Sequence, residues 1–219
     1  MEEFDSIMGR LKVAANPDKA IQMKAYMRNQ FEFYGISSPE RREIFRPFFS
    51  SLDKSAHPSS GFVDMCYKQD EREFHYLAME YVFYFRKRLT ASSLPLIRMM
   101  ITRHSWWDTV DYIASNILGY LVRRNPDLKN DQLEKWIVDD NMWLRRSALL
   151  FQLKYKSDTD TSFLENAIVN NLGSKEFFIN KAIGWSLRQY SKFNPDWVRE
   201  FIKAHELSAL SLREASRYI

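Results

Sequence analysis

The chain has 219 residues, of which 45% are hydrophobic and 27% charged, a composition typical of a globular protein rather than a disordered one. The single cysteine, Cys66, excludes an intramolecular disulfide and favours a reducing, cytoplasmic setting. The four histidines lie far apart and share no ligand spacing, so we expect no metal and no cofactor, and no apolar run is long enough to predict a membrane span.

The first part of the chain carries two helix-start signals. Only six glycines and seven prolines are present, which favours long helices over a β-rich fold. Asn16 and Ser38 are each followed by a proline, the pattern of an N-cap residue before the first helical position. We therefore expect one helix across residues 19–33 and a shorter one across 40–49.

A repeat follows from about residue 62 to 219, after N-terminal helices in about 1–50. Its helices place alanines among large apolar residues at successive spacings of 36, 34, 34 and 33: Ala78, Ala114, Ala148, Ala182 and Ala215. Other helices are expected between them, at 94–102, 131–139, 162–172 and 196–204. This period predicts an all-α fold, an α-solenoid of HEAT-like repeats forming one domain over 1–219, with the alanine helices as the inner layer of a concave face.

Positive charge is concentrated in the second half of the repeats. Residues 143–192 contain eight Lys or Arg and four Asp or Glu, an excess as large as the net charge of +4 for the whole chain. Lys154 and Arg188 each follow the alanine of their repeat by six residues, so they should project similarly. A concave face with repeated cations suits a phosphate backbone. A solvated helix face is the alternative explanation of the same pattern.

The stretch Ser105-Trp106-Trp107-Asp108-Thr109-Val110-Asp111 combines aromatic and acidic residues. Ser105 and Asp108 have the spacing of a capping box, which predicts a helix that begins at Trp106. Trp107 and Asp111 then share one face, where an aromatic ring and a carboxylate can hold a cationic group. The alternative is a buried tryptophan beside a solvated aspartate.

Two later helices are also expected to begin at serines. Ser174 is one candidate N-cap. Ser211 is the other, and Glu214 three residues later has the spacing of its capping-box partner.

Three stretches together resemble the AlkD family of bacterial DNA alkylation-repair glycosylases. They are Ser105 to Asp111, then Trp143-Leu144-Arg145-Arg146 with Phe151-Gln152-Leu153-Lys154-Tyr155-Lys156, then 175–185 continuing to Arg188-Gln189-Tyr190. The likeness extends to 26–29 and 35–42 and so covers nearly the whole chain. It implies an array of HEAT-like repeats, in agreement with the period of the alanines.

The resemblance also implies an activity. Proteins of this family hydrolyse the N-glycosidic bond of N3- or N7-alkylated purines, so the implied partner is double-stranded DNA containing alkylated bases. A monomer in the bacterial cytoplasm is expected. The implied catalytic residues are Asp111, as the carboxylate, with Trp107 and Trp185 lining the cleft. The implied DNA contacts are Arg146, on a phosphate near the lesion, with Lys154, Arg188 and the N-terminal aromatic Tyr26.

Two other functions are compatible with the pattern. The first is a non-catalytic protein of the same fold that binds damaged or distorted DNA. The second is a protein-binding scaffold, which the basic bias of the repeats disfavours. Trp185 also occupies a large apolar position shared with Phe151 and Tyr218, so it could belong to the core instead of a cleft. Trp136, Trp143 and Trp197 are expected to pack.

Overall fold

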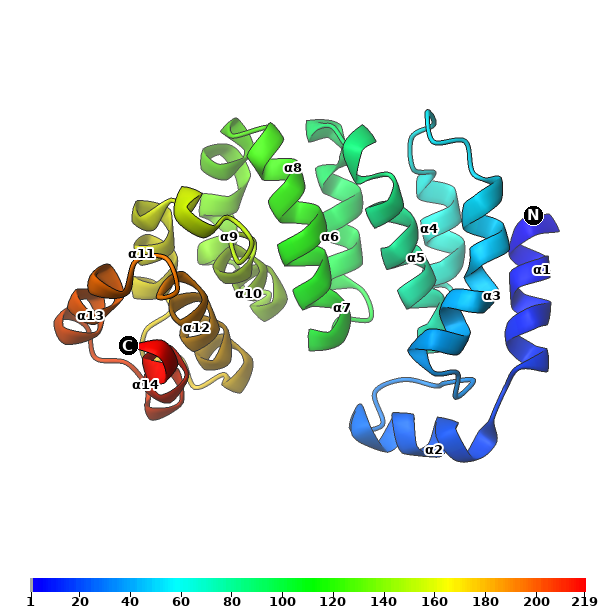
Figure 1. The fold of residues 1–219 in the computed structure, drawn as a ribbon, viewed down its shortest axis with the longest axis horizontal. Coiled ribbons are helices and arrows are strands. Elements are labelled where there is room, and N and C mark those ends of the chain that lie inside the picture. The colour runs from blue at the N-terminus through cyan, green and yellow to red at the C-terminus, as the bar shows by residue number, and fades with distance from the viewer. Residues whose placement is uncertain (1) are drawn as a thin grey trace. The chain divides into compact units, whose positions relative to one another are not determined.

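Helices account for nearly all the regular structure in the computed structural model, which describes residues 2–219 (Figure 1). Over this range the β-structure is a single isolated bridge between Glu32 and Glu71, so the all-α prediction is confirmed. Within the same residues, no helix combines the length and apolar character needed to cross a bilayer. Two units can be distinguished, residues 2–89 and Thr90–Ile219, and each is described by itself. A single domain over 1–219 stays a prediction.

The first unit consists of five α-helices and a short 3₁₀ turn within residues 2–89. They are α1 (Glu2–Val13), α2 (Pro17–Tyr26), α3 (Ser38–Ser51), α4 (Ser60–Tyr67), α5 (Arg72–Tyr84) and η1 (Arg86–Arg88). Asn16 caps α2 as predicted, since its side chain accepts from the Lys19 backbone N–H at 3.0 Å. The helix ends at Tyr26 and does not reach residue 33, because Arg28 and Asn29 adopt φ of +54° and +57°.

The start of α3 lies one residue earlier than predicted. Ser37, not Ser38, is the N-cap residue, and the Glu40 carboxylate accepts from its backbone N–H at 2.9 Å. This is a capping box whose serine precedes the Ser-Pro pair. The hydrogen bonds hold the pKa of Glu40 down at about 2.

The second unit contains the remaining helices. They are η2 (Ala91–Ser93), α6 (Leu94–Thr102), α7 (Trp107–Tyr112), η3 (Ile113–Leu118), α8 (Gly119–Arg124), η4 (Lys129–Leu133), α9 (Glu134–Ile137), α10 (Met142–Leu150), η5 (Lys156–Asp158), α11 (Thr161–Val169), α12 (Phe177–Tyr190), α13 (Pro195–Ala204), α14 (Ala209–Ala215) and η6 (Ser216–Tyr218). Segments η3 and η4 are π-helical, and α7, η3 and α8 form one continuous helix with a widened turn in its middle.

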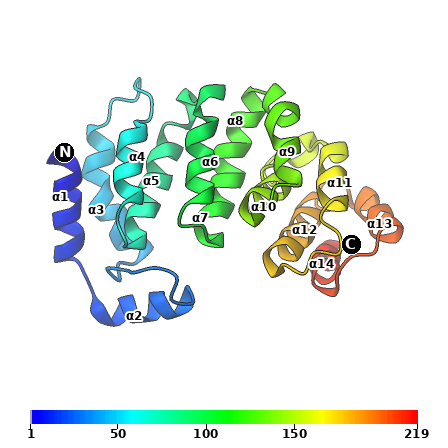
Figure 2. The ribbon, with the colours of Figure 1, turned by 180° about the vertical axis from the view of Figure 1, so that it is seen from behind.

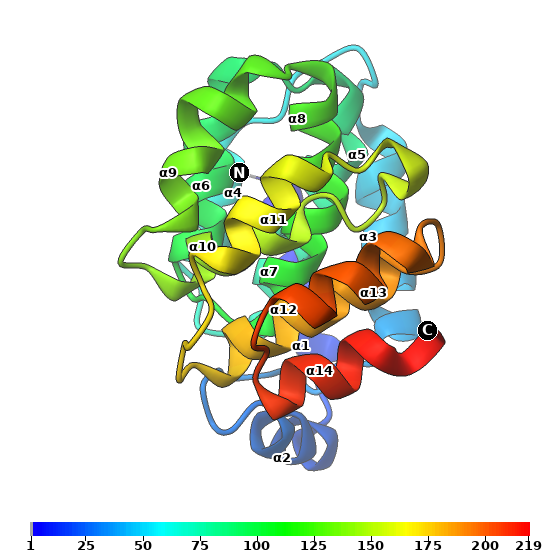
Figure 3. The same ribbon diagram turned by 90° about the vertical axis from the view of Figure 1, so that its left-hand side faces the viewer.

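The alanine helices of this unit pack side by side as a layer, as the repeat predicts. Segment η3 contacts α10, α10 contacts α12, and α12 contacts α14. Their alanines, Ala114, Ala148, Ala182 and Ala215, are all buried. Figure 3 shows α14 lying along α12. In the second layer α9 packs against α11 (Figure 2).

Two side-chain hydrogen bonds join successive repeats at nearly the same sequence separation. Tyr155 Oη donates to Gly119 O at 2.7 Å, and Ser186 Oγ donates to Leu149 O at 2.7 Å. The separations are 36 and 37 residues, close to the repeat period. Buried backbone carbonyls are thus satisfied by the neighbouring repeat, which ties the layer together beyond its apolar contacts.

Three predicted serine caps are wrong. Helix α7 begins at Trp107, with Trp106 in the extended N-cap conformation, and Ser105 Oγ instead donates to Ile101 O at 2.6 Å. Ser174 lies two residues before Glu176, the N-cap residue of α12. Ser208 caps α14, while Ser211 Oγ donates to Asn180 O in α12 at 2.8 Å. In two of these cases the serine bonds to a carbonyl of an earlier turn or a neighbouring helix, which competes with capping.

Candidate functional site

Asp111 and Arg146 form a two-bonded ion pair between α7 and α10. Arg146 Nε donates to Oδ1 of Asp111 and Nη2 donates to Oδ2, both at 2.7 Å. This parallel arrangement fixes both side chains in direction as well as in distance. The Asp111 side chain is 13% exposed and that of Arg146 only 3%. The carboxylate therefore keeps some access to solvent while the guanidinium is enclosed.

A third repeat completes the enclosure of Arg146. Its Nη1 donates to Phe178 O in α12, and the guanidinium carbon lies 5.6 Å from the centre of the Phe178 ring. Asp111 and Arg146 are 35 residues apart, and Arg146 and Phe178 are 32 apart. These spacings match the repeat, so three successive repeats contribute one residue each from similar positions. All three nitrogens of the guanidinium are engaged.

The electrostatics of Asp111 reflect two opposing effects. Burial raises the pKa of its carboxyl above the ordinary range, and the hydrogen bonds and charge of Arg146 oppose that rise. A carboxylate offers about four lone-pair directions and Arg146 uses two of them. Asp111 can therefore accept further hydrogen bonds or face a cation while it stays bound to Arg146.

The helix that carries Asp111 widens directly after it. In the π-helical segment η3, Gly119 N–H donates to Ala114 O, five residues back. Side chains donate hydrogen bonds to backbone carbonyls near the start of the widened turn. Ser115 Oγ donates to Asp111 O at 2.7 Å and Asn116 Nδ2 donates to Tyr112 O at 3.0 Å. Lys154, in the turn that follows α10, donates to Asn116 Oδ1 at 2.5 Å. Lys154 is thus linked to the turn that follows Asp111.

Aromatic side chains lie beside the ion pair. Trp106, Trp143 and Phe178 form a cluster with ring centres 5.1 to 5.9 Å apart. Trp107 is half-buried and four residues from Asp111 in α7, so both occupy one helix face. Trp185 is likewise half-buried in α12 and does not belong to the fully buried core, in contrast to Trp136, which is 3% exposed. The expected packing role of Trp136 is confirmed.

The four expected DNA contacts lie in different surroundings. Arg146 is buried and bound to Asp111, whereas the prediction requires it to reach a phosphate. Lys154 is exposed. Arg188 is partly exposed and donates to Glu214 of α14 at 2.6 Å. Tyr26 is 70% exposed at the end of α2, in the first unit.

The roles of three residues in this region are not predictable from the sequence. Phe178 lies within the motif at 175–185, but nothing in its type predicts that its carbonyl binds Arg146. Asn116 has no signal in the sequence beyond its position one turn after Tyr112. The spacing from Ser211 predicts a capping role for Glu214, but Glu214 pairs with Lys181 and Arg188 instead. Within residues 2–219 no cluster of His, Cys, Asp and Glu is arranged to hold a metal ion.

Comparison with known proteins shows which family the chain belongs to. The model of the family described as DNA alkylation repair enzyme matches residues 7–219. A solved structure titled "Predicted DNA alkylation repair enzyme from Enterococcus faecalis" is similar, with 35% sequence identity, a TM-score of 0.87, and coverage of 94% of this chain and 96% of that chain. No curated protein matches the chain. With the family model spanning nearly every residue and a close structural relative, this chain belongs to the DNA alkylation repair enzyme family.

Proposed function

We propose that this protein is a monofunctional DNA glycosylase that hydrolyses the N-glycosidic bond of cationic N3- or N7-alkylated purines in double-stranded DNA. The observation that carries the proposal is the Asp111 carboxylate, held rigidly by Arg146 yet open on its remaining lone pairs. Membership of the alkylation-repair family supports the substrate class. The substrates are cationic, and a carboxylate beside Trp107 suits a positive charge.

The chemistry needs little from the protein besides this carboxylate. When the bond breaks, its electron pair leaves with the alkylated base, which becomes neutral, and positive charge develops on the sugar. Water then adds to the sugar carbon and releases a proton, which Asp111 or solvent accepts. The base is already activated by its charge, so no second carboxyl group is required as an acid. A guanidinium such as that of Arg146 does not form a Schiff base, in line with a monofunctional reaction.

The ion pair with Arg146 weakens the stabilisation of the sugar cation by Asp111 but does not abolish it. At an effective dielectric of about 20, a carboxylate ~4 Å from the sugar stabilises a unit cation by about 4 kcal/mol. A guanidinium ~8 Å away, behind the carboxylate, opposes it by about 2 kcal/mol. The net stabilisation of about 2 kcal/mol corresponds to roughly 30-fold in rate. Half-buried Trp107 and Trp185 would add cation–π attraction and exclude water.

The test is release of 7-methylguanine and 3-methyladenine from methylated duplex DNA by the wild-type protein and by Asp111→Asn. We expect release by the wild type and a loss of about 30-fold or more in the variant. Asp196→Asn is the matched control, because Asp196 is an exposed carboxylate that pairs with Arg199 on α13. Its rate should equal that of the wild type.

Folding must be monitored in the same series. Asp111→Asn leaves the buried Arg146 without its counter-charge, which costs about 3–5 kcal/mol in comparable pairs. The double variant Asp111→Asn/Arg146→Gln removes both charges and should recover part of that stability while staying inactive. If both single and double variants released bases at the wild-type rate, the assignment of Asp111 would be wrong. Binding of duplex DNA without release, in the wild type too, would support the non-catalytic alternative.

A further inference from the structure

Glu214 lies between two cations of the neighbouring helix. From α14 it accepts a bond from Lys181 Nζ on Oε1 at 2.5 Å and one from Arg188 Nη1 on Oε2 at 2.6 Å. Glu214 is buried, at 8% exposure, and the pKa of its carboxyl is lowered, first by the Lys181 bond. The carboxylate is therefore charged and shared between Lys181 and Arg188.

The contact depends on a close approach of the two helices. Gly184 of α12 faces α14 so tightly that a Cβ there would lie 2.6 Å from the Glu214 Cβ and 2.8 Å from Ser211 O. Ser211 Oγ also donates to Asn180 O across the same interface. Helices α12 and α14 pack against each other (Figure 3). A glycine at position 184 allows the Glu214 side chain to reach cations on both sides of it.

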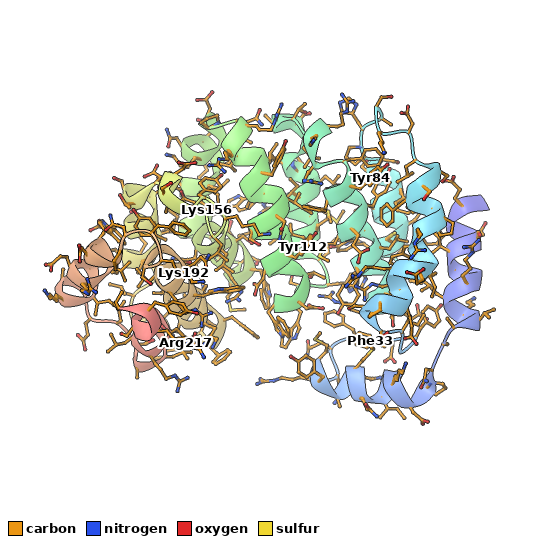
Figure 4. All side chains as sticks on the ribbon, in the orientation of Figure 1. Phe33, Tyr84, Tyr112, Lys156, Lys192 and Arg217 are labelled. Carbon is orange, nitrogen blue, oxygen red and sulfur yellow. The ribbon has the colours of Figure 1, made fainter. Side chains whose placement is uncertain are left out.

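Lys181 and Arg188 flank Trp185 on one stripe of α12. The three residues follow at spacings of four and three, so they project from the same helix face. Trp185 is half-buried, and the Lys181 and Arg188 side chains are 37% and 19% exposed. Arg217, which follows α14, adds positive charge near Glu214. Figure 4 shows Arg217 in this part of the second unit, with Lys192 nearby.

Arg188 and Arg146 differ in how many hydrogen-bond donors remain unused within the protein. Arg146 uses all three of its nitrogens within the protein and is enclosed. Arg188 uses only Nη1, and its other four N–H groups have no hydrogen-bond partner in the described part of the chain. Lys181 likewise keeps two of its three donors. Within the described residues, neither side chain has a buried nitrogen that lacks a partner, so these remaining donors reach solvent, where a phosphate can accept from them.

We propose that Lys181 and Arg188, held in place by Glu214, form a cradle for one phosphate of the DNA backbone beside Trp185. Glu214 is a positioning residue in this arrangement and does not touch the DNA. Two cations and one carboxylate leave a net positive charge, and the fixed geometry reduces the entropy lost when the phosphate binds. The proposal rests on the proposed function, because it takes duplex DNA to be the ligand.

The experiment uses a substitution that changes DNA affinity in opposite directions under the two explanations. Affinity of the full chain for an undamaged, fluorescently labelled duplex is measured over a series of KCl concentrations. The salt slope is the size of the decrease in log affinity per unit of log salt concentration. Removing the negative charge by Glu214→Gln should strengthen binding if charge alone matters. If Glu214 positions the cradle, binding should weaken by about threefold or more, and the salt slope should fall by up to about 0.9.

Glu200→Gln is the matched control, since Glu200 on α13 is exposed and pairs with Lys203 in the same helix. Its binding should be unchanged or slightly tighter. Lys181→Met should lower the salt slope by about 0.9, and Glu214→Gln should add little in that background. Should Glu214→Gln fail to fold by circular dichroism, Lys181→Met decides the matter, because its side chain is partly exposed.

The outcomes separate the two proposals. Tighter or unchanged binding by folded Glu214→Gln, or an unchanged salt slope in Lys181→Met, would overturn the cradle while the wild type still bound DNA and released alkylated bases. A wild-type chain that failed to bind duplex DNA would overturn the proposed function and the cradle with it.

Discussion

Asp111 and Arg146 meet through two parallel bonds of 2.7 Å, although 35 residues separate them. The pair uses two nitrogens of the guanidinium and leaves about half of the carboxylate's lone pairs free to accept other bonds. This geometry gives Arg146 a role that its residue type does not suggest, namely to hold Asp111. A phosphate contact by Arg146 stays a prediction, and it would require the guanidinium to leave its present site, because Arg146 is only 2% exposed.

Arg146→Lys should separate these two roles. A lysine ammonium keeps the charge but cannot form the parallel pair, so Asp111 loses its fixed direction. We expect base release to fall by about tenfold or more, because misplaced catalytic groups are costly. The affinity for undamaged duplex and its salt slope should not change. A salt slope reduced by about 0.9 would instead identify Arg146 as a phosphate ligand.

The pH dependence of base release should report Asp111. In the proposed mechanism the carboxylate form of Asp111 is the active one, and burial raises its pKa above the ordinary value of about 3.9. The rate should therefore fall as the pH decreases through a midpoint above 3.9, after subtraction of uncatalysed release. Arg146→Gln should move this midpoint further upward in any residual activity, because Arg146 lowers the pKa. A rate independent of pH down to the ordinary value would contradict this role for Asp111.

Trp185→Ala should affect activity more than stability. Trp185 is half-buried, so we expect its loss to lower the melting temperature by only a few degrees, about 5 °C or less. Trp136→Ala is the reference for a core tryptophan, with a cost of about 3–5 kcal/mol, or about 10 °C. Base release by Trp185→Ala should fall by about tenfold. Wild-type activity together with a loss of stability like that of Trp136→Ala would place Trp185 in the core.

Much of the architecture could be predicted, because the same residue types recur at the repeat period. A small residue is favoured where two helices approach closely, and an alanine recurs at the same place in successive repeats, so Ala114, Ala148 and Ala182 mark the layer. Helix caps were less predictable. The pattern of Ser211 and Glu214 fits a capping box, but a serine hydroxyl can equally serve a neighbouring helix, as Ser211 does with Asn180.

The partners of the charged residues could not be predicted. A basic residue in a cation-rich stretch can face solvent or another repeat, and its type is the same in both cases. Arg146 and Arg188 differ in what the neighbouring repeats present to them. Arg146 meets the Asp111 carboxylate of the preceding repeat and the Phe178 carbonyl of the following one, whereas Arg188 meets Glu214. The π-helical turn after Asp111 also lacks a sequence signature, since its carbonyls are satisfied by ordinary residues, Ser115 and Asn116.

Gly119→Ala should test whether the helix that carries Asp111 must lie this close to α10. A Cβ at Gly119 would lie 2.3 Å from Phe151 O, and a backbone carbonyl cannot move aside cheaply. Tyr155 Oη also donates to Gly119 O, which ties the same residue to the next repeat. We expect a loss of about 2 kcal/mol or more in the free energy of unfolding, measured by urea denaturation.

The control is Gly9→Ala in α1, because no atom lies within 4 Å of a Cβ added there. That change should stabilise the first unit by about 0.5–1 kcal/mol, since alanine is a better helix former than glycine. In Gly119→Ala, displacement of the helix should also move Asp111 away from Arg146, so base release should fall more than the fraction of folded protein does. Activity that falls only in proportion to the folded fraction would show that the ion pair tolerates the shift.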